Sequence, residues 1–146
     1  MRTHRCGEVR ASDAGTTVEL CGWVHTRRDH GGVIFIDLRD VSGLVQIVFN
    51  PDSSGDLFST AEQLRSEYCI KVTGPVRERP EGTVNPKLDT GEVEVVAESI
   101  EIFSRAETPP FQVDSQVEVD EQLRLKHRYI DLRRPEMQAN LKLRHA

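Results

Sequence analysis

Phe35 and Gln46 are the two side chains of this sequence whose chemistry is most specific, because a ring and an amide together can hold an unpaired nucleobase. The ring stacks on the flat face of the base, and the amide donates to and accepts from its edge. The interpretation requires both side chains to lie on the same surface. The elements around them must therefore be considered next.

The stretch 31–50 predicts a β-hairpin that would bring the two side chains together. Alternate residues of a strand share one face, and the even-numbered positions 34, 36 and 38 are aliphatic. A turn at residues 40–43 that pairs Arg39 with Leu44 places Asp37 opposite Gln46, with Phe35 as a diagonal neighbour. In the other interpretation a further element covers Phe35 as core. On the hairpin alone this second interpretation is favoured, because most strand phenylalanines are buried.

The 146 residues suit one small domain with an appendage, and their charge is unevenly distributed. The net charge is −5, yet residues 122–146 carry +5 and the preceding 121 residues carry −10. This balance argues against an indiscriminate nucleic-acid binder and predicts a local patch that relies on stacking and base-edge contacts. The three cysteines form no CxxC motif, so we expect reduced thiols, no metal site and a cytoplasmic protein. No apolar run is long enough for a membrane helix, and the first ten residues lack a signal core.

The order of elements predicts an all-β fold. Strands are expected at about 17–28, in both arms of the hairpin, at 68–79 and at 92–103, with a bulge or bend at Gly22. A helix is expected after Pro51, capped by Asp52, Ser53 or Ser54. Five strands with one helix between the third and fourth are typical of the OB-fold, a Greek-key barrel that binds oligonucleotides on its middle strands. This fold raises the base-binding interpretation of Phe35 above the alternative.

The chain divides into three predicted parts: an OB-fold domain over 1–104, an extended linker over 105–121, and a basic segment over 122–146. The linker contains Pro109-Pro110 and an acidic end. In the basic segment Pro135 is placed to begin a helix at its first turn.

Five motifs resemble one protein family in order and spacing over nearly the whole chain. They are RRDHGGVIFIDLRD, GLVQIVF, RPEGTVNP, TGEVEV and LRLKHRYIDLRRPEM. The chain is thereby similar to the amino-terminal part of a bacterial-type aspartyl-tRNA synthetase of class IIb. The resemblance implies an anticodon-binding OB-fold, a hinge and the beginning of a catalytic domain.

The family uses ATP and Mg²⁺, but the segments that hold them and aspartate lie downstream of the residues present here. We therefore expect no cofactor and no ligase activity in this chain alone. The family is a homodimer mainly through its catalytic domain, so a monomer is expected.

The resemblance also implies roles for six side chains. Phe35 would stack on the central uridine of the anticodon, and Gln46 would hydrogen-bond its edge. Arg28 would contact a base or phosphate, and Glu94 would accept from an exocyclic amine of a flanking base. Arg79 and Asn85 would contact the anticodon backbone or its first base. Simpler interpretations remain: solvated strand ends for the arginines, a polar outer face for Glu94, and a turn at Asn85.

His30 and Gly82 resemble the family subtype that charges both aspartate and asparagine tRNAs, in which an amidotransferase then completes asparagine synthesis. The two tRNAs differ only at the third anticodon base, and a glycine in the second loop leaves room there. Alternatively, Gly82 only turns its loop and His30 only ends the hairpin. Three rival functions stay open: a general single-strand-binding module, a protein-interaction domain, and a sister enzyme for lysine or asparagine.

Overall fold

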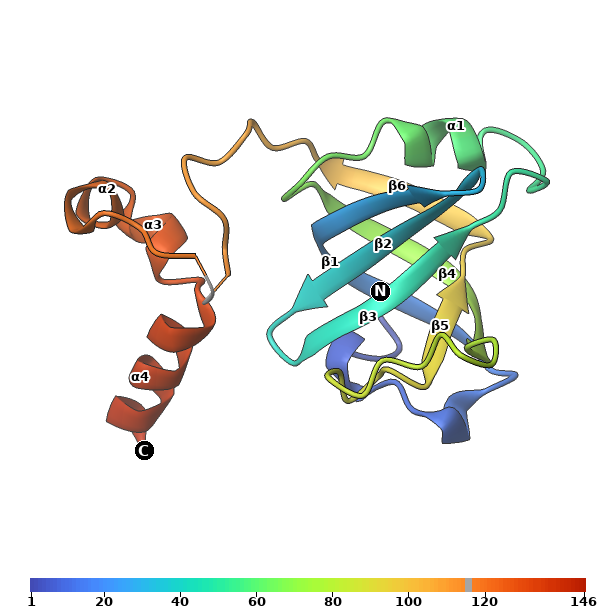
Figure 1. The fold of residues 1–146 in the computed structure, drawn as a ribbon, viewed down its shortest axis with the longest axis horizontal. Helices are drawn as coiled ribbons and strands as arrows, with labels where there is room; N and C mark the ends of the chain where they lie inside the picture. The colour runs from blue at the N-terminus through green and yellow to red at the C-terminus, as the bar shows by residue number, and fades with distance from the viewer. Residues whose placement is uncertain (115–116) are drawn as a thin grey trace. The chain divides into compact units, whose positions relative to one another are not determined.

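The computed structural model describes residues 1–114 and 117–146, and the chain falls into two compact units, Met1–Glu107 and Thr108–Ala146 (Figure 1). The predicted linker over 105–121 includes residues 115 and 116, which lie outside the described part. None of the helices among the described residues is long and apolar enough to cross a membrane.

The first unit is a closed β-barrel. Its strands are β1 (Thr17–His30), β2 (Val33–Asp40), β3 (Gly43–Phe49), β4 (Cys69–Glu78), β5 (Val93–Val96) and β6 (Ser99–Ser104). They follow the order β1-β2-β3-β5-β4-β6, and an additional pairing of β1 with β4 closes the barrel (Figure 1). The β3–β5 pair is parallel and the other pairs are antiparallel. This topology, with a short helix between β3 and β4, confirms the predicted OB-fold.

The strand predicted over 92–103 is bent into the two pieces β5 and β6. At the bend the Ala97 N–H donates to the Val48 carbonyl (2.9 Å) and the Glu98 N–H donates to the Thr73 carbonyl (2.8 Å). The chain thus leaves β3 and continues along β4 alone. A closed barrel needs such bends, and period-2 alternation does not reveal where they occur.

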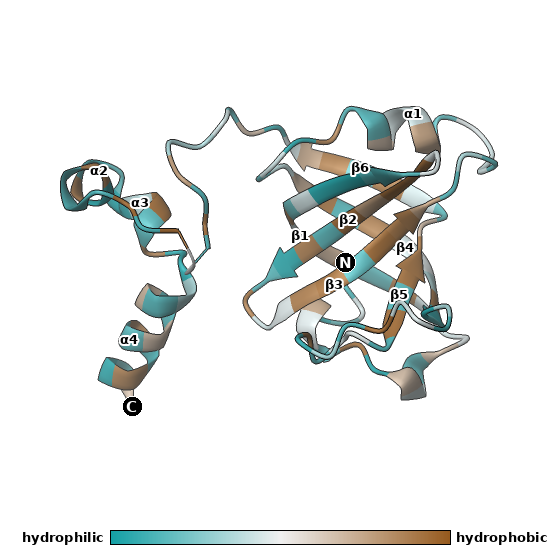
Figure 2. Cartoon of the chain, viewed as in Figure 1, coloured by the Kyte–Doolittle hydropathy of each residue, from teal (hydrophilic) through white to brown (hydrophobic). Residues whose placement is uncertain are grey.

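The barrel interior is built from the aliphatic positions that alternate along the strands. The hairpin contributes Ile34, Ile36, Leu38, Val45, Ile47 and Phe49, all at most 2% exposed. Figure 2 shows hydrophobic colours along most of β3 and β5. These side chains hold the hairpin against the core and leave its other face outside.

Strand β1 bends where it changes partners. Trp23 pairs with Cys69 of β4 and with Arg39 of β2, and the register with β2 shifts between Val24 and Thr26. The irregularity therefore follows Gly22 instead of lying at it. Gly22 serves a close approach, since a Cβ there would stand 2.4 Å from the Arg39 carbonyl oxygen.

Helix α1 (Leu57–Glu62) covers part of the barrel (Figure 1), with Leu57 and Ala61 buried. The predicted N-cap is wrong: the helix begins after Asp56, whose side chain makes no capping bond. Packing of the apolar residues places the helix start here, because burial stabilises a short helix more than a cap does.

Asp40 ties the turn of the β2–β3 hairpin to the N-terminal segment. Its carboxylate accepts from the backbone N–H groups of Cys6 (2.9 Å) and Ser42 (2.8 Å). The Ser42 hydroxyl accepts in turn from the Gly7 N–H (2.8 Å). Burial raises the pKa of Asp40, but the hydrogen bonds from Ser42 and Cys6 outweigh it and hold that pKa below its usual value. The turn that sets the hairpin register is therefore anchored.

A second polar cluster lies where β1 is irregular. Arg39 donates from Nη2 to both carboxylate oxygens of Glu67 (2.9 and 2.8 Å), and its Nη1 lies 2.8 Å from Nδ1 of His25. The Arg39 and Glu67 side chains are only 13% and 8% exposed. Glu67 has a φ of +66°, a conformation that is strained for residues other than glycine.

The second unit contains α2 (Glu121–Lys126), α3 (Arg128–Asp131) and α4 (Pro135–His145). Pro135 stands in the first turn of α4, as predicted. The buried Asp131 carboxylate accepts from Arg124 Nε (2.9 Å) and from Arg134 Nη1 (3.4 Å). This ion-pair cluster joins α2 and α3 to Arg134, the N-cap residue of α4, although α4 itself has no buried residue.

Candidate nucleic-acid interface

The hairpin register brings Phe35 and Gln46 onto one face of the sheet, as predicted. Asp37 pairs with Gln46, Phe35 pairs with Val48, and Arg39 pairs with Leu44. On the other side of β2, Phe35 pairs with Arg28 of β1. Phe35 is half-buried and does not belong to the core cluster, so its ring is not sealed inside the protein.

A continuous chain of polar side chains crosses this face beside Phe35. Arg28 Nη2 donates to Asp37 Oδ1 (3.0 Å) and to Gln46 Oε1 (3.2 Å). Gln46 Nε2 donates to Glu94 Oε2 (2.7 Å), and Arg77 Nε donates to Glu94 Oε1 (2.8 Å). Five strands, β1 to β5, thus share one network, which fixes how each group is oriented.

Glu94 lies on the outer face together with Gln46, but it is not exposed to solvent, so the simpler interpretation as part of a solvated polar face is wrong. Its side chain is 2% exposed, because β5 lies between β3 and β4 and the Gln46 and Arg77 side chains meet its carboxylate. The alternation of acids along 92–98 indicated a solvated face. It could not show that a parallel pairing places Gln46 next to this position.

Arg79 lies beside the network and retains one unused donor. Its Nε donates to the Val93 carbonyl (3.0 Å), whereas its Nη2 is buried with no hydrogen-bond partner among the described residues. The pKa of Arg79 is held below its usual value, mainly because the side chain is partly buried. The nearby charge of Arg28 lowers this pKa further, and the carboxylates of Glu94 and Asp37 raise it only in part. The unpaired N–H is a group that a phosphate or base oxygen would satisfy.

Asn85 forms the turn that the simpler interpretation described. Its side-chain oxygen accepts from the Lys87 N–H (3.0 Å), and its backbone N–H donates to the Gly91 carbonyl (3.0 Å). Its side-chain NH₂ group remains a donor. The structure therefore gives Asn85 a local role beside any contact with a ligand.

His30 and Gly82 both lie at exposed positions of loops or strand ends. His30 is the last residue of β1, where it pairs with Val33. Gly82 has a φ of +81°, and a Cβ there would meet no atom within 4 Å. Gly82 thus satisfies a turn requirement and also leaves open space around it.

Three network residues were absent from the predicted set: Thr26, Asp37 and Arg77. Asp37 was detectable, since alternation already placed it on the face of Phe35. Thr26 bonds the Asp37 carboxylate, and it faces that way only because of the β1 irregularity. Arg77 follows from its pairing with Glu94, which no local pattern indicates.

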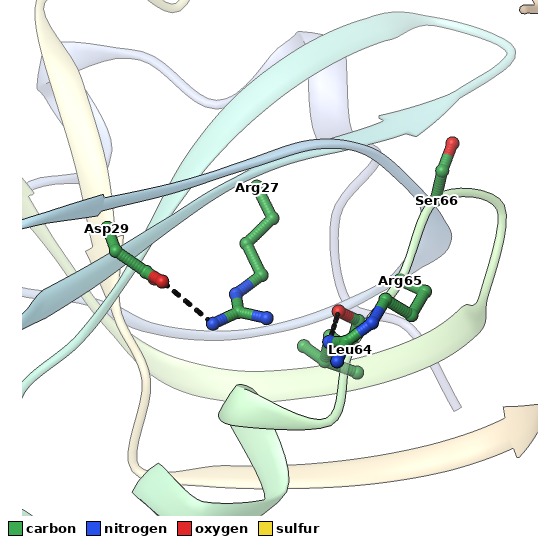
Figure 3. A pocket seen from close by; sticks show the side chains of 5 residues that line it. All are labelled: Arg27, Asp29, Leu64, Arg65 and Ser66. Carbon is green, nitrogen blue, oxygen red and sulfur yellow. Dashed lines mark hydrogen bonds and ion pairs between the residues drawn. The ribbon is translucent and has the colours of Figure 1, made fainter.

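A hollow in the first unit is lined by residues outside this network. It measures about 370 Å³ and is lined by Arg27, Asp29, Leu64, Arg65 and Ser66. Figure 3 shows the Arg27 guanidinium paired with Asp29 (2.9 Å). Arg27 Nη1 donates to the Glu62 carbonyl (2.8 Å) at the end of α1, so both terminal nitrogens have partners within the protein. Within residues 1–114 and 117–146, no group of His, Cys, Asp and Glu could hold a metal ion.

Comparison with known proteins identifies the family. The sequence profile named tRNA anti-codon, described as an OB-fold nucleic acid binding domain, matches residues 18–103. The chain belongs to this family. The OB-fold nucleic acid binding domain thus covers β1 to β6, including the whole face described above.

Full-length relatives are aspartate–tRNA ligases. The aspartate–tRNA(Asp/Asn) ligase of Moorella thermoacetica is 63% identical over 144 residues, covering 99% of this chain and 24% of that protein. The aspartate–tRNA ligase of Bacillus licheniformis is 58% identical over 145 residues, with the same coverage. The chain therefore spans about a quarter of these relatives, at their N-terminal end. This confirms the family resemblance and favours aspartate over the sister enzymes.

Solved structures agree. Asparaginyl-tRNA synthetase from Pyrococcus horikoshii superposes with a TM-score of 0.82 at 27% identity, covering 97% of this chain and 31% of that chain. Aspartyl tRNA synthetase from Entamoeba histolytica has a TM-score of 0.77 at 24% identity, covering 90% and 32%. The second likeness supports the fold alone.

Proposed function

We propose that the face carrying Phe35 and Gln46 binds the anticodon loop of aspartate tRNA, and also that of asparagine tRNA. The observation that carries the proposal is the common face of Phe35 and Gln46, with Arg28 bonded to the Gln46 amide (3.2 Å). Phe35 stacks on the central uridine and Gln46 bonds its edge. Arg28, together with the unpaired donor of Arg79, contacts phosphate or a neighbouring base. Asn85 contributes its NH₂ group.

The proposal extends to the protein from which the chain derives. Residues 1–104 are the anticodon-binding domain, 105–121 the hinge, and 122–146 the beginning of a catalytic domain. The whole protein is an aspartate–tRNA ligase that uses ATP and Mg²⁺ in the cytoplasm and forms a homodimer. The 146-residue chain alone binds tRNA without ligase activity, and we expect it to be a monomer.

A titration with anticodon stem-loops that differ at single bases tests this function. We expect the aspartate stem-loop to bind, and a change of its central uridine to weaken binding by roughly 1–3 kcal/mol, the usual scale for one recognised base. Fluorescence anisotropy of labelled stem-loops measures this. A poly-pyrimidine strand that competes as well as the stem-loop would contradict the proposal and favour a general single-strand-binding module.

Tolerance at the third anticodon base is a separate prediction, supported by the space around Gly82 and by the Asp/Asn specificity in the names of several relatives. Stem-loops of the aspartate and asparagine tRNAs should differ in binding free energy by less than the roughly 1 kcal/mol that one mismatched contact costs. The same titration measures it, with a central-base variant as the control for sensitivity. Many-fold weaker binding of the asparagine stem-loop would exclude dual specificity.

A further inference from the structure

We propose that Glu94 and Arg77 form a positioning pair that fixes the orientation of the Gln46 amide, and that this orientation selects uracil over cytosine at the base stacked on Phe35. The inference rests on the proposed function and deepens it. It gives Glu94 a role through Gln46, different from the contact with a flanking base that the family resemblance implies.

The amide orientation follows from what its two neighbours can do. Glu94 is an ionised carboxylate that only accepts hydrogen bonds, and it lies 2.7 Å from Gln46 Nε2. Arg28 only donates, and its Nη2 lies 3.2 Å from Gln46 Oε1. The amide nitrogen must therefore face β5, and the amide oxygen must face β1.

Arg77 holds the carboxylate in the position that this orientation requires. Its Nε and Nη2 lie 2.8 and 2.7 Å from Glu94 Oε1, which leaves Oε2 for Gln46. The Glu94 side chain is 2% exposed, so it has little space to move. The pair thus acts as a fixed acceptor beside Gln46, a residue that is itself only 7% exposed.

Turning the amide over would create two repulsive contacts. Its oxygen would meet the Glu94 carboxylate at the distance now occupied by an N–H···O bond, and its NH₂ group would meet the Arg28 donor. A buried polar group without a partner costs free energy, and here both ends of the amide would lose theirs. Gln46 is therefore not free to adapt to either pyrimidine.

The fixed amide matches uracil and not cytosine. After its two bonds within the protein, Gln46 retains one N–H and one lone pair on its oxygen. Uracil offers an acceptor at O4 beside the N3–H donor, whereas cytosine offers a donor at N4 beside the N3 acceptor. For a ring held against Phe35, cytosine would require the inverted amide. The burial of Glu94 also argues that it acts on Gln46 and not directly on a base.

The substitution Glu94→Gln removes this constraint with little change of shape. Arg77 keeps the oxygen of the new amide, whose NH₂ group then turns towards Gln46 and favours the inverted orientation. Glu92→Gln is the matched control, because it removes the same charge at an exposed position two residues away. Glu94→Asp is a second variant that retains the charge but withdraws the carboxylate.

The experiment measures affinities of the 146-residue chain for two stem-loops that carry uridine or cytidine at the central anticodon position. We expect the unchanged chain and Glu92→Gln to prefer uridine by about tenfold or more. We expect the preference to fall to about one, or to reverse, in Glu94→Gln, and to take an intermediate value in Glu94→Asp. Nuclear magnetic resonance of the Gln46 side-chain amide, without RNA, should show a changed environment in Glu94→Gln, and circular dichroism checks folding.

The outcomes separate the inference from the function. If the unchanged chain shows no preference for uridine, the proposed function itself fails. If it prefers uridine and Glu94→Gln weakens both stem-loops equally, Glu94 has only a structural role and the inference fails. Stem-loops changed at one flanking base are titrated in the same way: if Glu94→Gln loses discrimination there and keeps it at the central base, Glu94 contacts that flanking base and the positioning role is excluded. Should Glu94→Gln not fold, Glu94→Asp decides, and an unchanged ratio there overturns the inference.

Discussion

Glu67→Ala should lower the free energy of unfolding by about 3–5 kcal/mol, because it breaks one side of a nearly buried ion pair. The Glu67 and Arg39 side chains are 8% and 13% exposed, and both carboxylate oxygens accept from Arg39. Removing the carboxylate leaves the guanidinium charge in a site from which water is largely excluded. Urea denaturation followed by circular dichroism measures the loss.

The Lys71–Glu101 pair provides a matched control on the same barrel. Its atoms lie 2.9 Å apart, but the side chains are 29% and 57% exposed. Glu101→Ala should therefore cost under about 1 kcal/mol. Equal losses in the two variants would contradict the argument from burial.

The positive φ of Glu67 allows the effect of backbone strain to be separated from the effect of losing the carboxylate. A φ of +66° costs alanine about as much as glutamate, whereas glycine adopts it freely. Glu67→Gly should therefore destabilise the barrel less than Glu67→Ala by about 1 kcal/mol, although both remove the carboxylate. If glycine destabilised as much as alanine, the strain at this position would be negligible.

The cluster of Arg39, Glu67 and His25 also affects the face that carries Phe35, because it lies at the irregular part of β1. His25 lies in the register shift between Val24 and Thr26, and Arg39 bonds it. The shift is what aligns Thr26 with Asp37 and Arg28 with Phe35. We infer that the strained Glu67 and its partner hold β1 in the register that the network needs.

The hairpin was predictable from sequence because its determinants are local. Strict alternation separates the core face from the face of Phe35, and a turn of known length then fixes which residues are opposite. The register Asp37–Gln46 follows from these two facts alone. The order of the strands and the helix along the chain also depends on local patterns, and this order was sufficient to predict the OB-fold.

The remaining features depend on contacts between distant parts of the chain. Glu94 lies next to Gln46, 48 residues away, through the parallel pairing of β3 with β5. Neither the composition nor the alternation of residues along the strands indicates that β3 pairs with β5. The buried network, including the hydrogen bond from Arg77 to Glu94, therefore could not be predicted from the sequence. The cap of α1 was missed because packing, not capping, sets where that helix begins.

Phe35→Ala should cost about 1–3 kcal/mol of affinity for the aspartate anticodon stem-loop, the usual contribution of one stacked base. The ring is outside the core cluster, so its loss should leave the barrel intact and change binding alone. Fluorescence anisotropy gives the affinity, and thermal unfolding of the same sample gives the stability. The loss should not depend on which pyrimidine is central, because stacking does not distinguish base edges.

Phe103→Ala is the control for a general effect of removing a phenylalanine. Phe103 is 52% exposed on β6, which pairs with β4 and is not part of the Phe35 face. The Phe103→Ala variant should bind the stem-loop as tightly as the unchanged chain does.

If the Phe35→Ala and Phe103→Ala variants bound the stem-loop equally well, Phe35 would not stack on a base. Its half-buried ring would then only pack against neighbouring side chains of the barrel. If Phe35→Ala lost stability in proportion to affinity, the effect on binding would be indirect. A loss of affinity at unchanged stability, confined to Phe35, is the result that the geometry of this face predicts.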